Sequence, residues 1–169
     1  VEARLPLTTS EGLLEATKRV GTRYALVVTS EREAAPGSGM AQRLAEVAEA
    51  TEAAIVYADY REERDGQLFP HPLIDYQEGS LRDDFDMGCA WLARTEALLQ
   101  AAREQGGKYR HAALYAARLR MSREGGIFHL PEILYTARKN DTRRSGERQF
   151  DYVDPRNREV QAEMEAACT

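Results

Sequence analysis

The chain has 169 residues, of which 43% are hydrophobic and 30% are charged, and its formal net charge at neutral pH is -5. These values suit one packed domain, and they argue against a nucleic-acid binder that relies on bulk positive charge. The sequence contains no run of about 18 apolar residues and no signal-peptide core at its start, so it predicts no membrane span. Cys89 and Cys168 lack metal-ligand spacing, and we expect two free thiols in a reducing cytoplasm.

The first half of the chain alternates between helix-like and strand-like patterns. Apolar spacing predicts helices over about 11–20 and 39–51, and short apolar runs predict buried strands at 24–28 and 53–57. Proline and glycine indicate a loop over 34–39. Because helix and strand alternate with short connections, the sequence predicts an α/β fold with a mostly parallel sheet flanked by helices.

The second half continues both patterns and adds a polar appendage. The elements predicted there are a strand at 87–92, helices at 95–105 and 109–121, β-prone runs at 127–130 and 133–136 around Pro131, and a final helix at 157–167. Residues 140–155 have no clear period and predict a polar loop. We therefore expect one domain over 1–169, in which residues 140–169 form an appendage of loop and C-terminal helix.

The most concentrated set of candidate site residues lies between Tyr57 and Gly88. Asp59 follows the predicted strand at 53–57, and an acid-rich loop follows in turn. The acids of this loop include Asp75, Asp83, Asp84 and Asp86. Acidic side chains after the carboxyl end of a strand are typical of an active site in an α/β protein, which makes them candidates for catalysis or substrate recognition. Turn formation and N-capping are the alternatives.

Aromatic and basic side chains extend this candidate site. Tyr76 and Phe85 can stack on a sugar face, or they can pack the loop onto the domain. Arg143, Arg144 and Arg148 suit a diphosphate because guanidinium groups match phosphate geometry, although a solvated loop paired with nearby acids is the alternative. The histidines are scattered without ligand spacing, and we expect them to be exposed or satisfied side chains. They are His71, His111 and His129.

Three sequence blocks resemble a family 2 glycosyltransferase with the GT-A fold: YADY at 57–60, DDFDMG at 83–88 and HLPEILYTAR at 129–138. Two longer blocks, HPLIDYQEGSLRDDFDMG and DTRRSGERQFDYVDPRNREVQAEME, resemble a group of such enzymes from Bacteroidetes-type bacteria. The resemblance runs from about Ser10 to Cys168. It implies inverting transfer of a sugar from a nucleotide-sugar to a glycan or lipid-linked acceptor, usually with Mn²⁺ or Mg²⁺.

The resemblance also implies roles for particular positions. It aligns the metal-binding acids of the family with residues 29–31, where Glu31 keeps the only carboxylate for a hard cation. The acidic pair that contains the catalytic base aligns with Ala113 and Leu114, whose side chains cannot accept a proton. The first β/α units of the family, which hold the nucleotide base, align before Val1. We therefore expect a GT-A domain truncated at its nucleotide-binding start.

Two functions remain open from the sequence, and an unrelated α/β domain, which a sheet order unlike the GT-A fold would reveal, is the third possibility. One is a sugar-transfer domain in which Asp59 or the acids at 83–86 replace the missing catalytic groups. The other is a non-catalytic glycan-binding or scaffolding module that kept the fold and lost the chemistry. The substitutions at Ala113 and Leu114 favour the second function, whereas the acid-rich loop favours the first.

Overall fold

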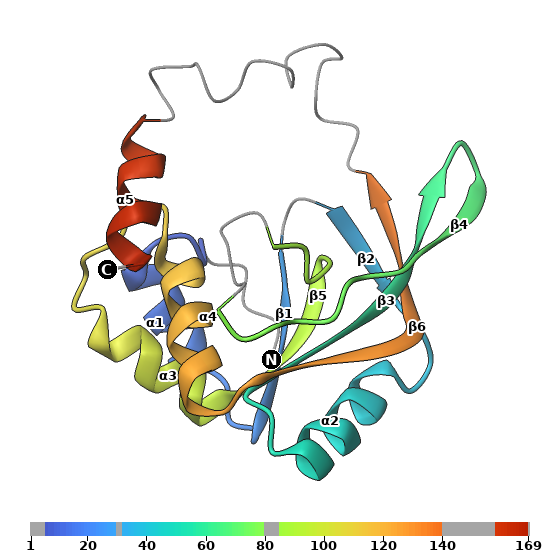
Figure 1. The fold of residues 1–169 in the computed structure, drawn as a ribbon, viewed down its shortest axis with the longest axis horizontal. Helices are drawn as coiled ribbons and strands as arrows, with labels where there is room; N and C mark the ends of the chain where they lie inside the picture. Colours follow the sequence, from blue (N-terminus) through green and yellow to red (C-terminus); the bar gives the residue numbers. More distant parts are fainter. Residues whose placement is uncertain (1–5, 30–31, 80–84, 140–157, 169) are drawn as a thin grey trace.

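The computed structural model describes residues 6–29, 32–79, 85–139 and 158–168, which form a curved sheet and five helices (Figure 1). The strands are β1 (Tyr24–Val28), β2 (Arg32–Pro36), β3 (Ile55–Arg64), β4 (Gln67–His71), β5 (Ala90–Arg94) and β6 (Ile127–Lys139). The helices are α1 (Ser10–Lys18), α2 (Met40–Thr51), α3 (Thr95–Glu104), α4 (Ala113–Glu124) and α5 (Arg158–Cys168). None of these helices is long and apolar enough to cross a membrane.

The sheet is mixed and mostly antiparallel, so the predicted mostly parallel sheet of a truncated GT-A domain is wrong. The strand order is β1-β5-β3-β6-β2, with β4 also paired to β3. Among the described pairs, only β3 and β6 run parallel. Helix–strand alternation suggested that β1 and β3 point the same way, and they do. It did not reveal that β5 inserts between them, antiparallel to both.

The hairpin of β3 and β4 lies in the stretch after Asp59 where the sequence predicted an acid-rich loop. Asp65 and Gly66 both have positive φ, at 52° and 76°, which suits the two-residue turn of a tight hairpin. The charged residues before Asp65 therefore continue β3, and Tyr60 to Arg64 pair with β4. An Asp-Gly pair is a recognised hairpin signal, but the absence of apolar alternation around it hid the two strand segments.

Two other strands also differ from the sequence-based expectation. β2 occupies part of the loop predicted at 34–39, and its strand geometry depends on antiparallel pairing with β6. β6 joins the two predicted short runs into one strand. Its pairing with β3 shifts register between Ala58 and Tyr60, opposite the segment that contains Pro131. Proline cannot donate to the ladder, and a bulge at this point accommodates it.

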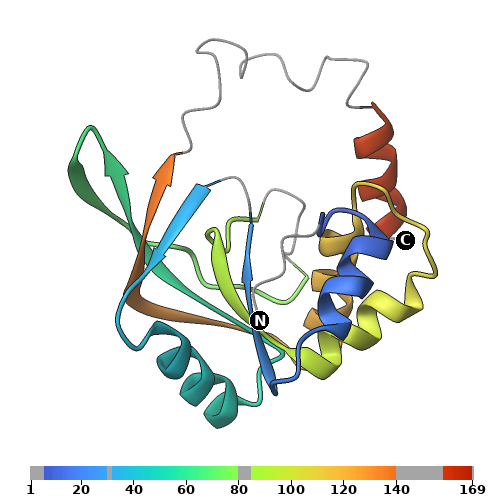
Figure 2. The ribbon, with the colours of Figure 1, turned by 180° about the vertical axis from the view of Figure 1, so that it is seen from behind.

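Helices cover the two faces of the sheet unequally. Helices α1, α3, α4 and α5 gather together, whereas α2 lies apart from them (Figures 1 and 2). Alternate residues of a strand point to opposite faces, so Tyr57 joins the core beside α3 and α4, whereas Tyr60 joins the core beside α2. The predicted burial of β1 is wrong at one face, because Leu26 and Val28 are exposed at this sheet edge.

Candidate functional site

The parallel pairing of β3 and β6 builds the main candidate site. It sets His129 of β6 directly beside Tyr57 of β3, two residues before Asp59. The segment after β4 then brings Asp75 to the same place. We call Tyr57, Asp59, Asp75 and His129 the Asp59–His129 cluster. Its members are far apart in the sequence, and the sheet register brings them together.

The imidazole of His129 is held on three sides. Its Nε2 lies 2.9 Å from Oδ1 of Asp59, and its Nδ1 lies 2.6 Å from Oδ1 of Asp75. The Tyr57 ring stacks on it with a centroid separation of 4.9 Å and an interplanar angle of 18°. The His129 side chain is 5% exposed, whereas that of Asp75 is 86% exposed. The cluster is thus buried at the ring and open to solvent at Asp75.

Three consecutive residues, Leu73, Ile74 and Asp75, each form a hydrogen bond with a side chain of β3 or β6. The backbone N–H of Leu73 donates to Oδ1 of Asp59 at 2.8 Å. The Tyr57 hydroxyl donates to the carbonyl oxygen of Ile74 at 2.5 Å. Burial raises the pKa of the Tyr57 phenol, and the two nearby carboxylates add smaller contributions in the same direction. The phenol therefore stays protonated at neutral pH and remains a donor.

Tyr76 and Phe85, the predicted sugar-stacking residues, lie next to this cluster and are half-buried. Phe85 meets Tyr57 edge to face, with centroids 6.1 Å apart, and Tyr76 meets Phe85 in the same way at 6.0 Å. Both side chains pack against the core beside α3 and α4. In this arrangement they support the segment that carries Asp75.

Asp86 lies in a different group, on the other face of β3. One of its oxygens accepts a hydrogen bond from the backbone N–H of Gly88 at 2.7 Å, which is a turn-forming contact. The other lies 3.5 Å from Nε2 of His71, whose ring stacks on Tyr60 with centroids 4.5 Å apart. Glu62 completes this group, which we call the His71 cluster. The structure therefore does not bring Asp59 and Asp86 together.

Several predicted site residues lie outside the described part of the chain. They are Glu31, Asp83, Asp84, Arg143, Arg144 and Arg148. Within the described ranges, no group of three or more His, Cys, Asp or Glu side chains is arranged to hold a metal ion. Asp59 and His129 are a pair of neighbouring donor side chains in these ranges.

The first turn of α4, which begins with Ala113 and Leu114, contains no acidic side chain. The Glu163 carboxylate of α5 lies there instead and accepts N–H bonds from Arg110, His111 and Ala112, at 2.9, 2.7 and 3.2 Å. Partial burial acts to raise the Glu163 pKa, but the three backbone donors outweigh it, and the pKa is lowered overall. Sequence reasoning missed this anchor, because neither the spacing nor the composition of α5 marks Glu163.

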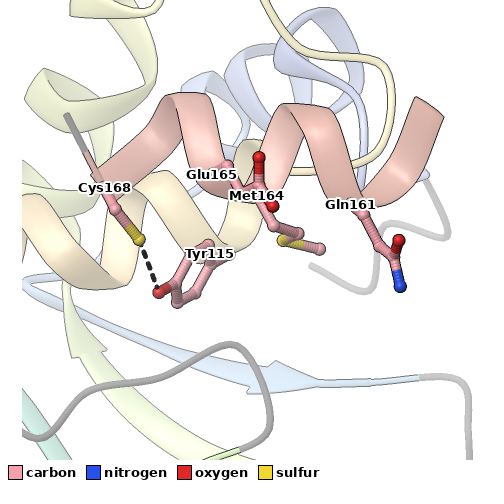
Figure 3. Close-up of a pocket in the computed structure, with 5 residues that line it drawn as sticks. All are labelled: Tyr115, Gln161, Met164, Glu165 and Cys168. Atoms are coloured by element: carbon pink, nitrogen blue, oxygen red, sulfur yellow. Dashed lines mark hydrogen bonds between the residues drawn. The ribbon is translucent and has the colours of Figure 1, made fainter. Parts of the chain in front are cut away.

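A pocket of about 360 Å³ lies where α5 meets α4 (Figure 3). Its lining residues are Tyr115, Gln161, Met164, Glu165 and Cys168. The Cys168 sulfur lies 3.1 Å from the Tyr115 hydroxyl oxygen, and Met164 packs against the core. None of these residues belongs to the Asp59–His129 cluster, so the pocket is a feature of helix docking rather than part of the candidate site.

His129 is the member of the Asp59–His129 cluster that sequence reasoning set aside, because it shares no ligand spacing with another histidine. The usable signal was its place inside the β-prone run at 127–130, which the structure pairs with the run ending at Tyr57. No model of a known protein family matches this chain. A comparison with curated proteins found no match either.

Proposed function

We propose that this chain takes part in sugar transfer from a nucleotide-sugar to a glycan or lipid-linked acceptor, and that Asp59 and His129 hold a divalent cation on the diphosphate of the donor. The observation that carries the proposal is the contact between Nε2 of His129 and Oδ1 of Asp59, at 2.9 Å in a largely buried position. The sequence resemblance to family 2 glycosyltransferases supplies the substrate class.

The donor set of this pair fits such a cation. A carboxylate oxygen and an imidazole nitrogen already point at each other, and His129 keeps a carboxylate on its far nitrogen, as metal-binding histidines usually do. Mg²⁺ and similar ions commonly use one or two carboxylates and take their other ligands from substrate phosphates and water. A cage of three protein side chains is therefore not required. The mixed oxygen and nitrogen pair favours Mn²⁺ over Mg²⁺, which prefers oxygen ligands.

The residues around the pair have separate tasks in this proposal. When bound, the cation would neutralise negative charge on the departing diphosphate. Tyr57 excludes water from one face of the His129 ring and holds the segment 73–75 through its hydroxyl. The Leu73 N–H fixes the Asp59 carboxylate. Asp83 and Asp84 remain candidates for the base that accepts the acceptor's proton, and both lie outside the described residues.

A specific observation favours a second function, that of a non-catalytic glycan-binding module. Ala113 and Leu114 occupy the positions where the resemblance implies an acidic pair, and the backbone donors just before them already bind Glu163. A chain with this arrangement lacks the usual proton acceptor. Under this alternative, Asp59 and His129 join strands and loop without binding a cation.

Calorimetric titration with Mn²⁺ and uridine diphosphate tests the proposal. We expect the wild-type chain to bind the nucleotide only when Mn²⁺ is present, and Asp59→Asn to weaken this binding by more than about 100-fold, since it removes a charged ligand. Asp86→Asn is the matched control, because its carboxylate lies in the His71 cluster, and its affinity should stay within about 2-fold of wild type. Absence of Mn²⁺-dependent nucleotide binding in the wild type would reject the proposal, and glycan binding without it would support the second function.

A further inference from the structure

The backbone of β1 bonds to β5 on one side and directs its remaining polar groups to the other side. Just after β1, the Thr29 N–H donates to the Cys89 carbonyl oxygen at 2.9 Å. Just before β1, the Arg23 carbonyl oxygen accepts the Thr95 N–H at 3.0 Å. Neighbouring residues of a strand direct their N–H and C=O groups to opposite sides, so only the odd-numbered residues of β1 face β5. The outward-facing residues are Tyr24, Leu26 and Val28.

Within the described part of the chain, no strand pairs with this outward edge. β1 ends the strand order, and β5 is its one strand partner there. The Thr22 hydroxyl donates to the Tyr24 carbonyl oxygen at 2.7 Å, which leaves that oxygen a second lone pair. Leu26 and Val28 are 36% and 45% exposed, whereas Val27, on the opposite face, is 6% exposed. Unpaired backbone groups beside exposed apolar side chains are a template for another strand.

The other border strands contain residues that discourage such pairing, whereas β1 does not. β2 contains Glu33 and Pro36, and β4 contains Pro70. Charged side chains and proline are the usual means by which sheet edges avoid an added strand. The sequence of β1 is YALVV, which contains neither a charge nor a proline. The composition of the three border strands therefore identifies β1 as the edge open to a partner.

We propose that β1 pairs with β1 of a second copy of this chain, antiparallel, about a two-fold axis at Leu26. In this register Leu26 lies opposite Leu26 of the second copy and Val28 lies opposite Tyr24, so every outward-facing residue meets another. An aromatic residue opposite a β-branched one is a favourable cross-strand pair. Arg23 lies opposite Thr29, so no like charges meet. The edge is thus complementary to itself, as a two-fold interface requires. One short strand buries little area, so the dimer should be weak and reversible.

Sedimentation velocity over a range of concentrations tests the dimer and its register. Leu26→Lys should weaken association of the chain by more than about 100-fold, because the axis sets two lysines opposite each other, and Leu26→Glu should do the same. An equimolar mixture of these two variants should associate again, since unlike charges then meet. Ile133→Lys is the control, because Ile133 is 40% exposed and lies in β6. A wild type that stays monomeric up to about 1 mM, or a mixture that associates no better than either variant, would overturn the inference.

Amide hydrogen exchange identifies the edge that the dimer uses. The Leu26 and Val28 amides should exchange slowly at high protein concentration and quickly after dilution, whereas the Val27 amide, which faces β5, should stay protected at both. Leu26→Pro removes an outward N–H but no bond to β5, so it should abolish the dimer while the circular dichroism spectrum is kept. If this variant does not fold, the mixture of charge variants decides. Protection of Leu26 and Val28 that is independent of concentration would place another segment of the same chain at this edge and would overturn the inference.

Discussion

The Asp59–His129 cluster and the His71 cluster use similar residues on opposite faces of β3, yet their electrostatics differ. Each stacks a histidine on a tyrosine of β3 and places acids around the ring. His129 is 5% exposed and has acid oxygens at 2.6 and 2.9 Å, whereas His71 is 33% exposed and has them at 3.5 and 4.0 Å. In the His71 cluster, Glu62 already pairs with Arg64.

This difference separates the proposed cation site from the His71 cluster. Glu62 is 2% exposed, and the Arg64 guanidinium compensates its charge. Among the described residues, Asp59 and Asp75 have ion-pair contacts with His129 alone. An uncompensated acid beside an imidazole can gain from a divalent cation, whereas an acid already paired with arginine gains less. The His71 cluster is thus better suited to joining β3, β4 and the segment that carries Asp86.

The largest loss of stability should come from a substitution at Gly88, which lies next to the His71 cluster. Its φ is +72°, and a Cβ added there would lie 2.0 Å from the Tyr135 hydroxyl oxygen, beside the ring that stacks on Tyr60. Gly88→Ala should lower the free energy of unfolding by about 2–4 kcal/mol, because left-handed strain and overpacking add. Gly79→Ala is the control, with a similar φ but open space around it. Equal losses in urea denaturation would contradict the packing argument.

Removing Arg64 tests whether its guanidinium stabilises the buried carboxylate of Glu62. Arg64→Ala removes the guanidinium that pairs with the buried Glu62, and we expect the melting temperature to fall, by less than for a fully buried pair because Arg64 is largely exposed. Arg61→Ala removes an exposed arginine from the other face of β3 and should cost less than about 0.5 kcal/mol. Thermal unfolding measures both. Similar values for the two variants would show that Glu62 does not need this partner.

Tyr57→Phe should test the hydroxyl that holds segment 73–75 while keeping the stack on His129. The loss of one hydrogen bond should lower the free energy of unfolding by about 1 kcal/mol. Tyr76→Phe is a matched control, because its hydroxyl accepts one exposed, 3.3 Å bond from Gly79 and should contribute less. Amide hydrogen exchange at Ile74 and Asp75 should rise in Tyr57→Phe alone. Unchanged exchange there would show that the hydroxyl does not hold the segment.

The smallest effect on stability should come from Glu163. Its carboxylate is stabilised by backbone N–H donors, not by a histidine or an arginine. Its pKa is lowered in the folded chain, so the stabilisation is present above the ordinary glutamate value of 4.5 and is lost as the pH falls through the folded value. The amide proton shifts of residues 110–112 should report a midpoint below 4.5. Glu163→Gln should abolish this titration, whereas Glu159→Gln should not. A midpoint at or above the ordinary value would contradict the proposed anchor.

Local patterns located much of the secondary structure. All five described helices lie near predicted ones, and β1 coincides with the predicted strand at 24–28. Apolar periodicity and capping act over a few residues, so a sequence window contains the relevant information. β2 and β4 have no such pattern, since both become strands by pairing with a neighbour. The order of β1, β5 and β3 likewise depends on contacts between distant segments.

The candidate site, too, was predictable from the sequence only in part. The sequence alone determined the position of Asp59 after an apolar strand, the aromatic and acidic content of the following segment, and the lack of acids at Ala113 and Leu114. Only the tertiary structure decided that His129, 70 residues away, contacts Asp59, and that Asp75 rather than Asp86 joins them. The reason is physical: strand direction and register depend on packing over the whole sheet, and a shift of one residue would turn His129 to the opposite face.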